Sequence, residues 1–271
     1  MKILVTGATG NVGRHVVAQL TGHEVRVMVR SEAAFPEGIE VVRGDLGQPE
    51  TLPEALAGVD AVFLFAVPGS GPAFVAAAEA AGVSRVVFLS SNAAANPDNA
   101  IGAYHHEIEE ALRGSGLFWT FLRSGHMATN ALPWAAQTRA GDVVRGPYAE
   151  ATSAPVHEAD MAAVAVLALT EPGHEGQIYE VTGPESITAA QQVELIGQAL
   201  GRPISYQELP PEVAREQMSK FIPPFIIGPL FDGWAASVGV PAKVTPTVEK
   251  LTGRPARTFA EWARDRAADF S

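Results

Sequence analysis

Three glycines near the start of the chain, each separated from the next by two residues, have the clearest chemical meaning in this sequence. The run is Gly7-Ala8-Thr9-Gly10-Asn11-Val12-Gly13, and it directly follows the apolar residues Ile3-Leu4-Val5. Gly7 permits a tight turn out of a strand, Gly10 lets a pyrophosphate approach the backbone, and Gly13 lets the next helix pack closely. A helix over about residues 11–20 would point its free N–H groups at the phosphates. We therefore predict a phosphate cradle; the alternative is a glycine-rich turn that binds no ligand.

Two side chains that follow later strands suit the adenosine half of a nucleotide cofactor. Arg30 follows the apolar run 25–29, where an acidic residue would hold the ribose hydroxyl of NAD and an arginine would pair with a 2′-phosphate. Arg30 therefore favours NADP(H), and its alternative is a solvated arginine at a strand end. Asp45 is placed to accept a hydrogen bond from an adenine amino group; it would serve equally well as an N-cap or in an Asx turn.

The elements that must position these residues alternate regularly. Strands are predicted at 25–29, 39–42, 61–65, 85–89 and 118–122, and helices at 11–20, 51–56, 74–81 and 105–113. Near-continuous apolar strands joined by helical crossovers are typical of a doubly wound α/β fold with a parallel sheet covered on both faces. In such sheets ligands bind outside the carboxyl ends of the strands.

The alternation loosens beyond about residue 125. Helices near 160–169 and 189–200 flank a strand at 177–181, and the last helix begins with Thr258 and Glu261 in the spacing of a capping box. We predict a nucleotide-binding domain over residues 1–150 and a smaller α/β substrate-binding domain over residues 151–271, partly interleaved with the first and supplying a lid.

Composition excludes several classes of protein. The formal net charge of −11 over 271 residues, with no cluster of Lys and Arg, argues against nucleic-acid binding. The absence of cysteine rules out disulfides, thiolate metal sites and cysteine nucleophiles, and it fits a reducing compartment. The apolar segment 221–231 contains three prolines and is too short to span a membrane. Because the first strand begins at residue 3, leaving no room for a signal peptide, we expect a cytoplasmic protein with no membrane partner.

An ordered series of motifs resembles the NmrA-like NAD(P)-binding proteins, of the atypical and extended short-chain dehydrogenase/reductase group. The motifs are Thr6-Gly7-Ala8-Thr9-Gly10-Asn11-Val12-Gly13, Val29-Arg30, Gly44-Asp45, Ser115-Gly116-Leu117-x-Trp119-Thr120-x-Leu122-Arg123, Val156-His157-x-x-Asp160-Met161-Ala162 and Thr182-Gly183-Pro184-Glu185. The resemblance runs from residue 1 to about 205. It implies a Rossmann domain that holds NADP(H), with a small C-terminal domain closing over the nicotinamide.

The same resemblance implies a set of cofactor contacts. Those with the pyrophosphate would be Thr9, Gly10, Asn11 and Val12, following the turn at Gly7; Arg30 would meet the 2′-phosphate, and Asp45 with Leu46 the adenine. Those on the ribose and nicotinamide side would be Phe65, Ala66 and Ser90.

The sequence departs from the pattern of hydride-transferring short-chain dehydrogenases at the catalytic Tyr-x-x-x-Lys pair. Counting back from Leu112, the lysine position falls on His105 and the tyrosine position on Ile101, so neither catalytic residue is present. His105 could donate to a ribose hydroxyl or relay a proton, and the further catalytic candidates are Tyr104 and Ser91.

An alternative places His105 and His106 partly exposed on an acidic helix, with His105 and Glu109 as an ordinary i, i+4 surface pair. No metal site is expected, because adjacent side chains in the segment 105–107 point to different faces of the helix and no further ligand is evident.

The residues that would contact a substrate are less clearly indicated by the sequence than those that would contact the cofactor. Candidates to line a pocket for a small organic molecule are His126, Met127, Trp134, His157 and the segment 221–231; core packing or a homodimer contact would explain them equally well. We expect an NADP(H)-dependent oxidoreductase that reduces a small apolar or aromatic carbonyl, enone or quinone by direct hydride delivery. The alternatives are an NADP(H)-binding redox sensor without turnover and an isomerase or dehydratase of the same fold.

Overall fold

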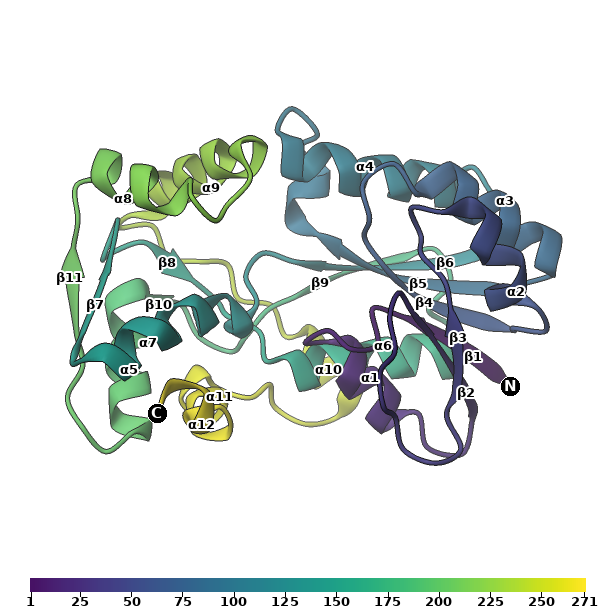
Figure 1. The fold of residues 1–271 in the computed structure, drawn as a ribbon, viewed down its shortest axis with the longest axis horizontal. Helices are drawn as coiled ribbons and strands as arrows, with labels where there is room; N and C mark the ends of the chain where they lie inside the picture. The colour runs from purple at the N-terminus through teal and green to yellow at the C-terminus, as the bar shows by residue number, and fades with distance from the viewer. The chain divides into compact units, whose positions relative to one another are not determined.

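The computed structural model describes residues 1–271, and the chain packs into two compact units (Figure 1). The first unit consists of residues 1–124, 158–181 and 250–253, and the second of residues 125–157, 182–249 and 254–271. The chain therefore leaves the first unit after residue 124 and later returns to it. The division drawn from the sequence at residue 150 falls inside the second unit.

A seven-stranded parallel sheet forms the centre of the first unit, in the order β3-β2-β1-β4-β5-β6-β9. The strands are β1 (Lys2–Thr6), β2 (Glu24–Val29), β3 (Glu40–Arg43), β4 (Ala61–Phe65), β5 (Arg85–Ser91), β6 (Phe118–Ser124) and β9 (Gln177–Val181). The order reverses between β1 and β4, which is the place where sheets of this kind bind ligands. The predicted doubly wound α/β fold is confirmed.

Helices cover both faces of this sheet (Figure 1). On one face, α2 (Leu52–Leu56), α3 (Gly71–Ala81) and α4 (Ala100–Arg113) share a buried apolar cluster with the strands. On the other face, α1 (Gly13–Gln19) packs against α6 (Glu158–Thr170). The short 3-10 turns η1 (Pro49–Thr51) and η2 (Asn92–Ala95) precede α2 and α4. Coverage on both sides explains why β1 and β4 are apolar almost without interruption.

The return of α6 and β9 to the first unit shifts the boundary expected from the sequence, which placed residues 151–271 in a smaller domain partly interleaved with the first. β9 extends the sheet beside β6, with Gln177–Val181 paired in parallel to residues 120–124. The helix α6 is buried around most of its circumference. Its sequence therefore shows no polar stripe that would indicate which unit it packs against. Such non-local pairing depends on tertiary contacts that the local pattern of residues does not encode.

Two arginines inside the sheet hold the ends of helices on its two faces. Arg26 in β2 donates from Nη1 to the carbonyl oxygens of Ala55 at 2.9 Å and Ala57 at 2.8 Å, at the end of α2. Arg85 in β5 donates from Nη1 to the carbonyl oxygen of Ala168 at 3.0 Å, near the end of α6. Each guanidinium satisfies helix carbonyls that have no partner within the helix and opposes the negative end of the helix dipole. These contacts fix where both helices end relative to the sheet.

The second unit combines short strands with helices around its own core. Its elements are η3 (Ala128–Trp134), α5 (Ala135–Ala140), β7 (Val143–Gly146), β8 (Thr152–Ser153), β10 (Ile187–Thr188), α7 (Ala189–Ala199), β11 (Ser205–Glu208), α8 (Pro211–Met218), α9 (Pro224–Ser237), α11 (Phe259–Asp265), α12 (Ala267–Phe270) and the start of α10 (Thr247–Thr252). The core is built on Phe259, Trp262 and Phe270. The predicted capping box of the last long helix is present, with Thr258 and Glu261 exchanging hydrogen bonds.

The apolar segment 221–231 divides into a packed and an exposed part. Ile227 and Phe231 are buried with Ala214 in a small core between α8 and α9. Phe221 is 88% exposed and Phe225 is 53% exposed, so core packing does not account for these two rings. None of the helices in the molecule has both the length and the apolar composition that crossing a membrane would require.

Candidate cofactor and active site

The glycine-rich turn between β1 and α1 is closed by its own backbone. Gly7 has a φ of +63°, a conformation that glycine adopts without penalty, and the N–H of Gly10 donates to its carbonyl oxygen at 2.9 Å. The N–H groups of Asn11, Val12 and Gly13 make no hydrogen bond within the chain, and no side chain caps α1. Three backbone donors therefore face outward at the start of a helix, which is the arrangement that a pyrophosphate requires.

The three glycines are constrained to different degrees. A Cβ on Gly13 would lie 2.2 Å from the carbonyl oxygen of Gly7, an impossible contact with backbone. A Cβ on Gly10 would meet only the same oxygen, at 3.0 Å. The sequence assigned Gly13 to close packing of the helix on the sheet, and the structure shows that Gly13 packs against the turn itself. Gly13 is therefore needed to form the cradle, whereas Gly10 leaves its outer side open.

Thr6, which sequence reasoning did not single out, joins the cradle to β4. Its Oγ1 donates to the carbonyl oxygen of Phe63 at 3.0 Å and accepts from the N–H of Phe65 at 2.7 Å. These bonds hold Phe65 beside the turn, where a Cβ on Gly7 would lie 3.1 Å from the Cβ of Phe65. The Phe65 ring is 48% exposed and so offers an apolar surface next to the cradle. The neighbouring Ala66 is buried.

The adenosine-side candidates lie at the ends of β2 and β3. Arg30 is exposed and has no hydrogen-bond or ion-pair partner. Asp45 forms the Asx turn that was one alternative, since its Oδ1 accepts from the N–H of Gly47 at 2.9 Å; its other oxygen makes no hydrogen bond within the chain. The Leu46 side chain is buried in the core, so only its backbone is left for a ligand.

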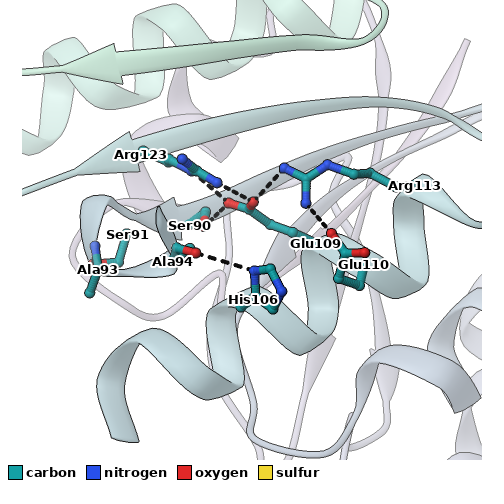
Figure 2. Close-up of polar contacts among 9 residues, drawn as sticks. All are labelled: Ser90, Ser91, Ala93, Ala94, His106, Glu109, Glu110, Arg113 and Arg123. Carbon is teal, nitrogen blue, oxygen red and sulfur yellow. Dashed lines mark hydrogen bonds and ion pairs between the residues drawn. The ribbon is translucent and has the colours of Figure 1, made fainter. Parts of the chain in front are cut away.

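Behind the carboxyl ends of β5 and β6 lies a buried charge network centred on Glu109 of α4 (Figure 2). Glu109 is fully buried. Its carboxylate accepts from Ser90 Oγ at 2.6 Å, from Arg123 Nε at 2.9 Å and from Arg113 Nη2 at 2.9 Å, with a further bond from Arg123 Nη2. Arg113 also pairs with the exposed Glu110 at 2.6 Å. The network ties α4 to both strands at the edge where a cofactor would bind.

The environment keeps Glu109 ionised although it is buried. Burial alone would raise the pKa of this carboxyl, but hydrogen bonds from Arg123 and Ser90 and the charges of Arg123 and Arg113 outweigh it, so the pKa lies below its usual value. Ser90 is 5% exposed and donates its only hydrogen to Glu109. The geometry thus gives Ser90 a contact inside the protein, in place of the exposed position expected for a ligand of the nicotinamide side.

His105 and His106 both donate Nδ1–H to backbone carbonyls, because a carbonyl oxygen can only accept. The His105 bond goes to Ile101 at 2.8 Å and the His106 bond goes to Ala94 at 3.2 Å. Their Nε2 atoms are therefore the unprotonated ones in the neutral rings. Burial lowers the pKa of His105, which is 8% exposed and lies against the Tyr104 ring, with ring centroids 4.1 Å apart and the planes tilted by 32°. His106 is partly exposed, as the alternative expected, but His105 and Glu109 do not form a surface pair, since both are buried and Glu109 bonds to Ser90, Arg113 and Arg123.

The remaining catalytic candidates differ in how free their hydroxyls are. Burial raises the pKa of Tyr104, so its hydroxyl is a weaker acid than an exposed tyrosine. Ser91 caps η2 by accepting from the N–H of Ala93 at 3.2 Å, and pairs in register with Ser124 on the next strand. Ser124 Oγ is buried without a hydrogen-bond partner. The structure therefore brings Ser90, Ser91 and His105 to one edge of the first unit.

The substrate-side candidates of the second unit have mixed surroundings. Trp134 packs against the core and lies edge-on to Tyr206, and His157 Nε2 lies 3.3 Å from a carboxylate oxygen of Asp265. Met127 pairs with Val156. Burial lowers the pKa of the partly exposed His126 to about 4, so this ring is neutral at physiological pH. Core packing explains the position of Trp134. The ring of His126 is partly exposed and uncharged.

Comparison with known proteins agrees with this geometry. The family model described as NAD(P)H-binding matches residues 7–172. The chain is 43% identical, over 99% of both sequences, to (4-alkanoyl-5-oxo-2,5-dihydrofuran-3-yl)methyl phosphate reductase of Streptomyces griseus. It is 38% identical to the NAD(P)H azoreductase of Xenophilus azovorans, again over 99% of both sequences.

Among solved structures, the chain resembles the NADPH-dependent quinone oxidoreductase QOR2 of Escherichia coli in complex with NADPH. The TM-score is 0.79 at 28% identity, over 97% of this chain and 99% of the other. The expected cofactor class and the expected class of enzyme are confirmed by these matches. The chain belongs to the NAD(P)H-binding family and, within it, to the NAD(P)H-dependent oxidoreductases.

Proposed function

We propose that the protein transfers a hydride from NADPH to a small conjugated acceptor such as a quinone or an enone. The observation that carries this proposal is a dinucleotide cradle at an edge of the sheet where Ile101, His105 and Ser90 have no proton to give to a substrate. Ile101 stands at the expected tyrosine position. His105 and Ser90 both donate their hydrogens to groups inside the protein.

A reductase without the catalytic Tyr-x-x-x-Lys pair suits an acceptor whose product anion is stable. When bound, NADPH supplies the hydride. Hydride addition to a quinone or enone moves a π-electron pair onto oxygen and leaves a delocalised anion, which then takes its proton from water. A simple ketone would leave a localised alkoxide, which needs a proton in the transition state. The names of the relatives, which describe a quinone oxidoreductase and an azoreductase, support an acceptor of this class.

The residues of the first unit have separate roles in this proposal. Backbone donors at Asn11 and Val12, with Thr9 and Gly10 beside them, hold the pyrophosphate. Arg30 pairs with the 2′-phosphate, and the free carboxylate oxygen of Asp45 accepts from the adenine. Phe65 and Ala66 shape the nicotinamide side. The Nε2 lone pair of His105 accepts a hydrogen bond from a ribose hydroxyl, which is the opposite of the donor role suggested by its position in the sequence.

We also propose a cellular location for the protein and a contact surface on it. The absence of cysteine is consistent with a cytoplasmic location, which cell fractionation with an antibody tests directly. The exposed rings Phe221 and Phe225 are consistent with a homodimer contact, and equally with contact to an apolar substrate.

The experiment compares acceptors of similar size that differ in conjugation. NADPH oxidation is followed with benzoquinones and cyclic enones, and with saturated cyclic and aromatic ketones as the matched control set. We expect turnover with the conjugated acceptors and none with the ketones. Equal rates with both sets would show that a proton donor acts in the transition state and would overturn the proposal.

A further inference from the structure

The arginines of the first unit fall into two groups. Four of its seven arginines pair with carboxylates, namely Arg26 with Glu40, Arg85 with Glu175, and Arg113 and Arg123 with Glu109. The other three have no carboxylate partner, namely Arg14, Arg30 and Arg43. Arg30 follows β2 and Arg43 ends the adjacent strand β3, whereas Arg14 lies in the first turn of α1. In a chain of net charge −11, two cations without a carboxylate partner therefore lie at neighbouring strand ends.

Arg30 and Arg43 lie at neighbouring strand ends. Arg43 is the last residue of β3 and pairs in register with Val29, the residue before Arg30. The N–H of Gly44 donates to the carbonyl oxygen of Val29 at 2.9 Å, so the two chains stay together through this point. Parallel strands run about 4.8 Å apart, and both arginine side chains are exposed. The two exposed guanidinium groups therefore extend from adjacent backbones.

Arg14 is held differently. Its Nη2 donates to Oδ1 of Asn11 at 2.8 Å, within the glycine-rich turn. This contact keeps its guanidinium next to the pyrophosphate cradle. The three unpaired arginines therefore divide into one beside the pyrophosphate position and two beyond the ends of β2 and β3.

We propose that Arg43 is a second ligand of the 2′-phosphate of NADPH and that Arg30 and Arg43 together set the preference for NADPH over NADH. A phosphate monoester carries a charge of about −1.5 to −2 near neutral pH and three acceptor oxygens, enough for two guanidinium groups. Two guanidinium groups can bind it with several charge-assisted hydrogen bonds. Because the cations repel each other without a ligand, the phosphate also removes an unfavourable interaction. This inference rests on the proposed use of NADPH.

The test measures binding of NADPH, NADH and 2′,5′-ADP by calorimetry, with 5′-AMP as the fragment that lacks the 2′-phosphate. We expect Arg43→Ala to weaken NADPH and 2′,5′-ADP about tenfold, in line with a charge-assisted hydrogen bond, and to leave NADH unchanged. Arg43→Lys should retain part of the affinity. Arg30→Ala/Arg43→Ala should bind NADPH and NADH equally. Arg14→Ala should weaken both dinucleotides alike, and Arg145→Ala, an exposed arginine of the second unit, should change none of them.

The outcomes separate this inference from the proposed function. If wild type binds NADPH more tightly than NADH and Arg30→Ala alone removes the difference, while Arg43→Ala and Arg43→Lys behave as wild type, the role of Arg43 is overturned and the use of NADPH stands. An Arg43→Ala variant that weakens NADH as much as NADPH would likewise overturn it. If wild type shows no preference between NADPH and NADH, the proposed use of NADPH fails as well.

Discussion

At the scale of single residues, the neutral and charged groups behind the cofactor edge are set by hydrogen bonds to the protein. Glu109 is ionised although buried, because two arginines and a serine donate to it. His105 is neutral with its proton on Nδ1, because burial lowers its pKa and Ile101 accepts the proton. Both groups therefore have assigned protonation states at neutral pH, and each leads to a measurable expectation.

Glu109→Gln should destabilise the protein by about 3 kcal/mol, because it removes the buried carboxylate that binds both Arg123 and Arg113. The measurement is urea unfolding at neutral pH, with the exposed Glu110→Gln as control. Because the folded pKa of Glu109 is depressed, its contribution is present above the usual carboxyl pKa and lost as pH falls through the folded value. The difference between wild type and Glu109→Gln should therefore shrink in acid. A difference that does not change with pH would contradict this assignment.

His105→Leu removes the proposed acceptor and keeps an apolar side chain of similar bulk. We expect it to weaken NADPH binding about two- to tenfold, the range for one hydrogen bond, and to leave the shape of the pH–rate profile unchanged. The control is His106→Leu, which should not alter cofactor affinity, since the His106 ring contacts Ala94 of η2. A titration near neutral pH that is present in wild type and lost in His105→Leu would instead identify His105 as a proton donor.

At the scale of elements, hydrogen bonds and ion pairs between strands, turns and helices hold the site in place. Thr6 bonds β1 to β4 beyond their paired residues, and the Glu109 network bonds α4 to β5 and β6. Arg26 and Arg85 hold the ends of α2 and α6 on opposite faces of the sheet. The backbone donors of the cradle depend on this frame, since they take their direction from the start of α1.

The glycine-rich turn provides a matched pair of variants. Gly13→Ala should prevent normal folding, because the new Cβ would lie 2.2 Å from a backbone oxygen. Gly10→Ala should fold, with a tight contact at 3.0 Å, and should bind NADPH more weakly because its methyl group lies where the pyrophosphate approaches. Circular dichroism and thermal melting report the first effect and calorimetry the second. Equal stability of the two variants would be inconsistent with this geometry.

At the scale of the whole molecule, charge and apolar surface are unevenly distributed. The chain carries a net charge of −11, and two arginines of the first unit that have no carboxylate partner, Arg30 and Arg43, lie at the ends of β2 and β3. In the second unit, Phe221 and Phe225 are exposed beside the small core that buries Ile227 and Phe231. These two exposed rings are the basis of the proposed contact with a second copy of the chain or with an apolar substrate.

Replacing Phe221 and Phe225 together by serine should leave stability nearly unchanged, because neither ring belongs to a core. If the rings form a homodimer contact, the variant should be monomeric by light scattering at concentrations where wild type is a dimer. If they contact the substrate, the variant should raise KM for apolar quinones with kcat little affected. A variant that matches wild type in both measurements would remove these rings from either role.

The sequence by itself determined the parallel α/β fold, the glycine-rich cradle and the cationic group at Arg30, because these depend on local features: apolar runs, a fixed glycine spacing and the residue after a strand. It also predicted the capping box at Thr258, which spans only four residues. Tertiary structure alone decided that β9 and α6 join the first unit, that Ser90 donates to Glu109, and that Arg30 and Arg43 are neighbours. These features join residues 13 or more positions apart in the chain, and their physical basis is burial and pairing between distant segments.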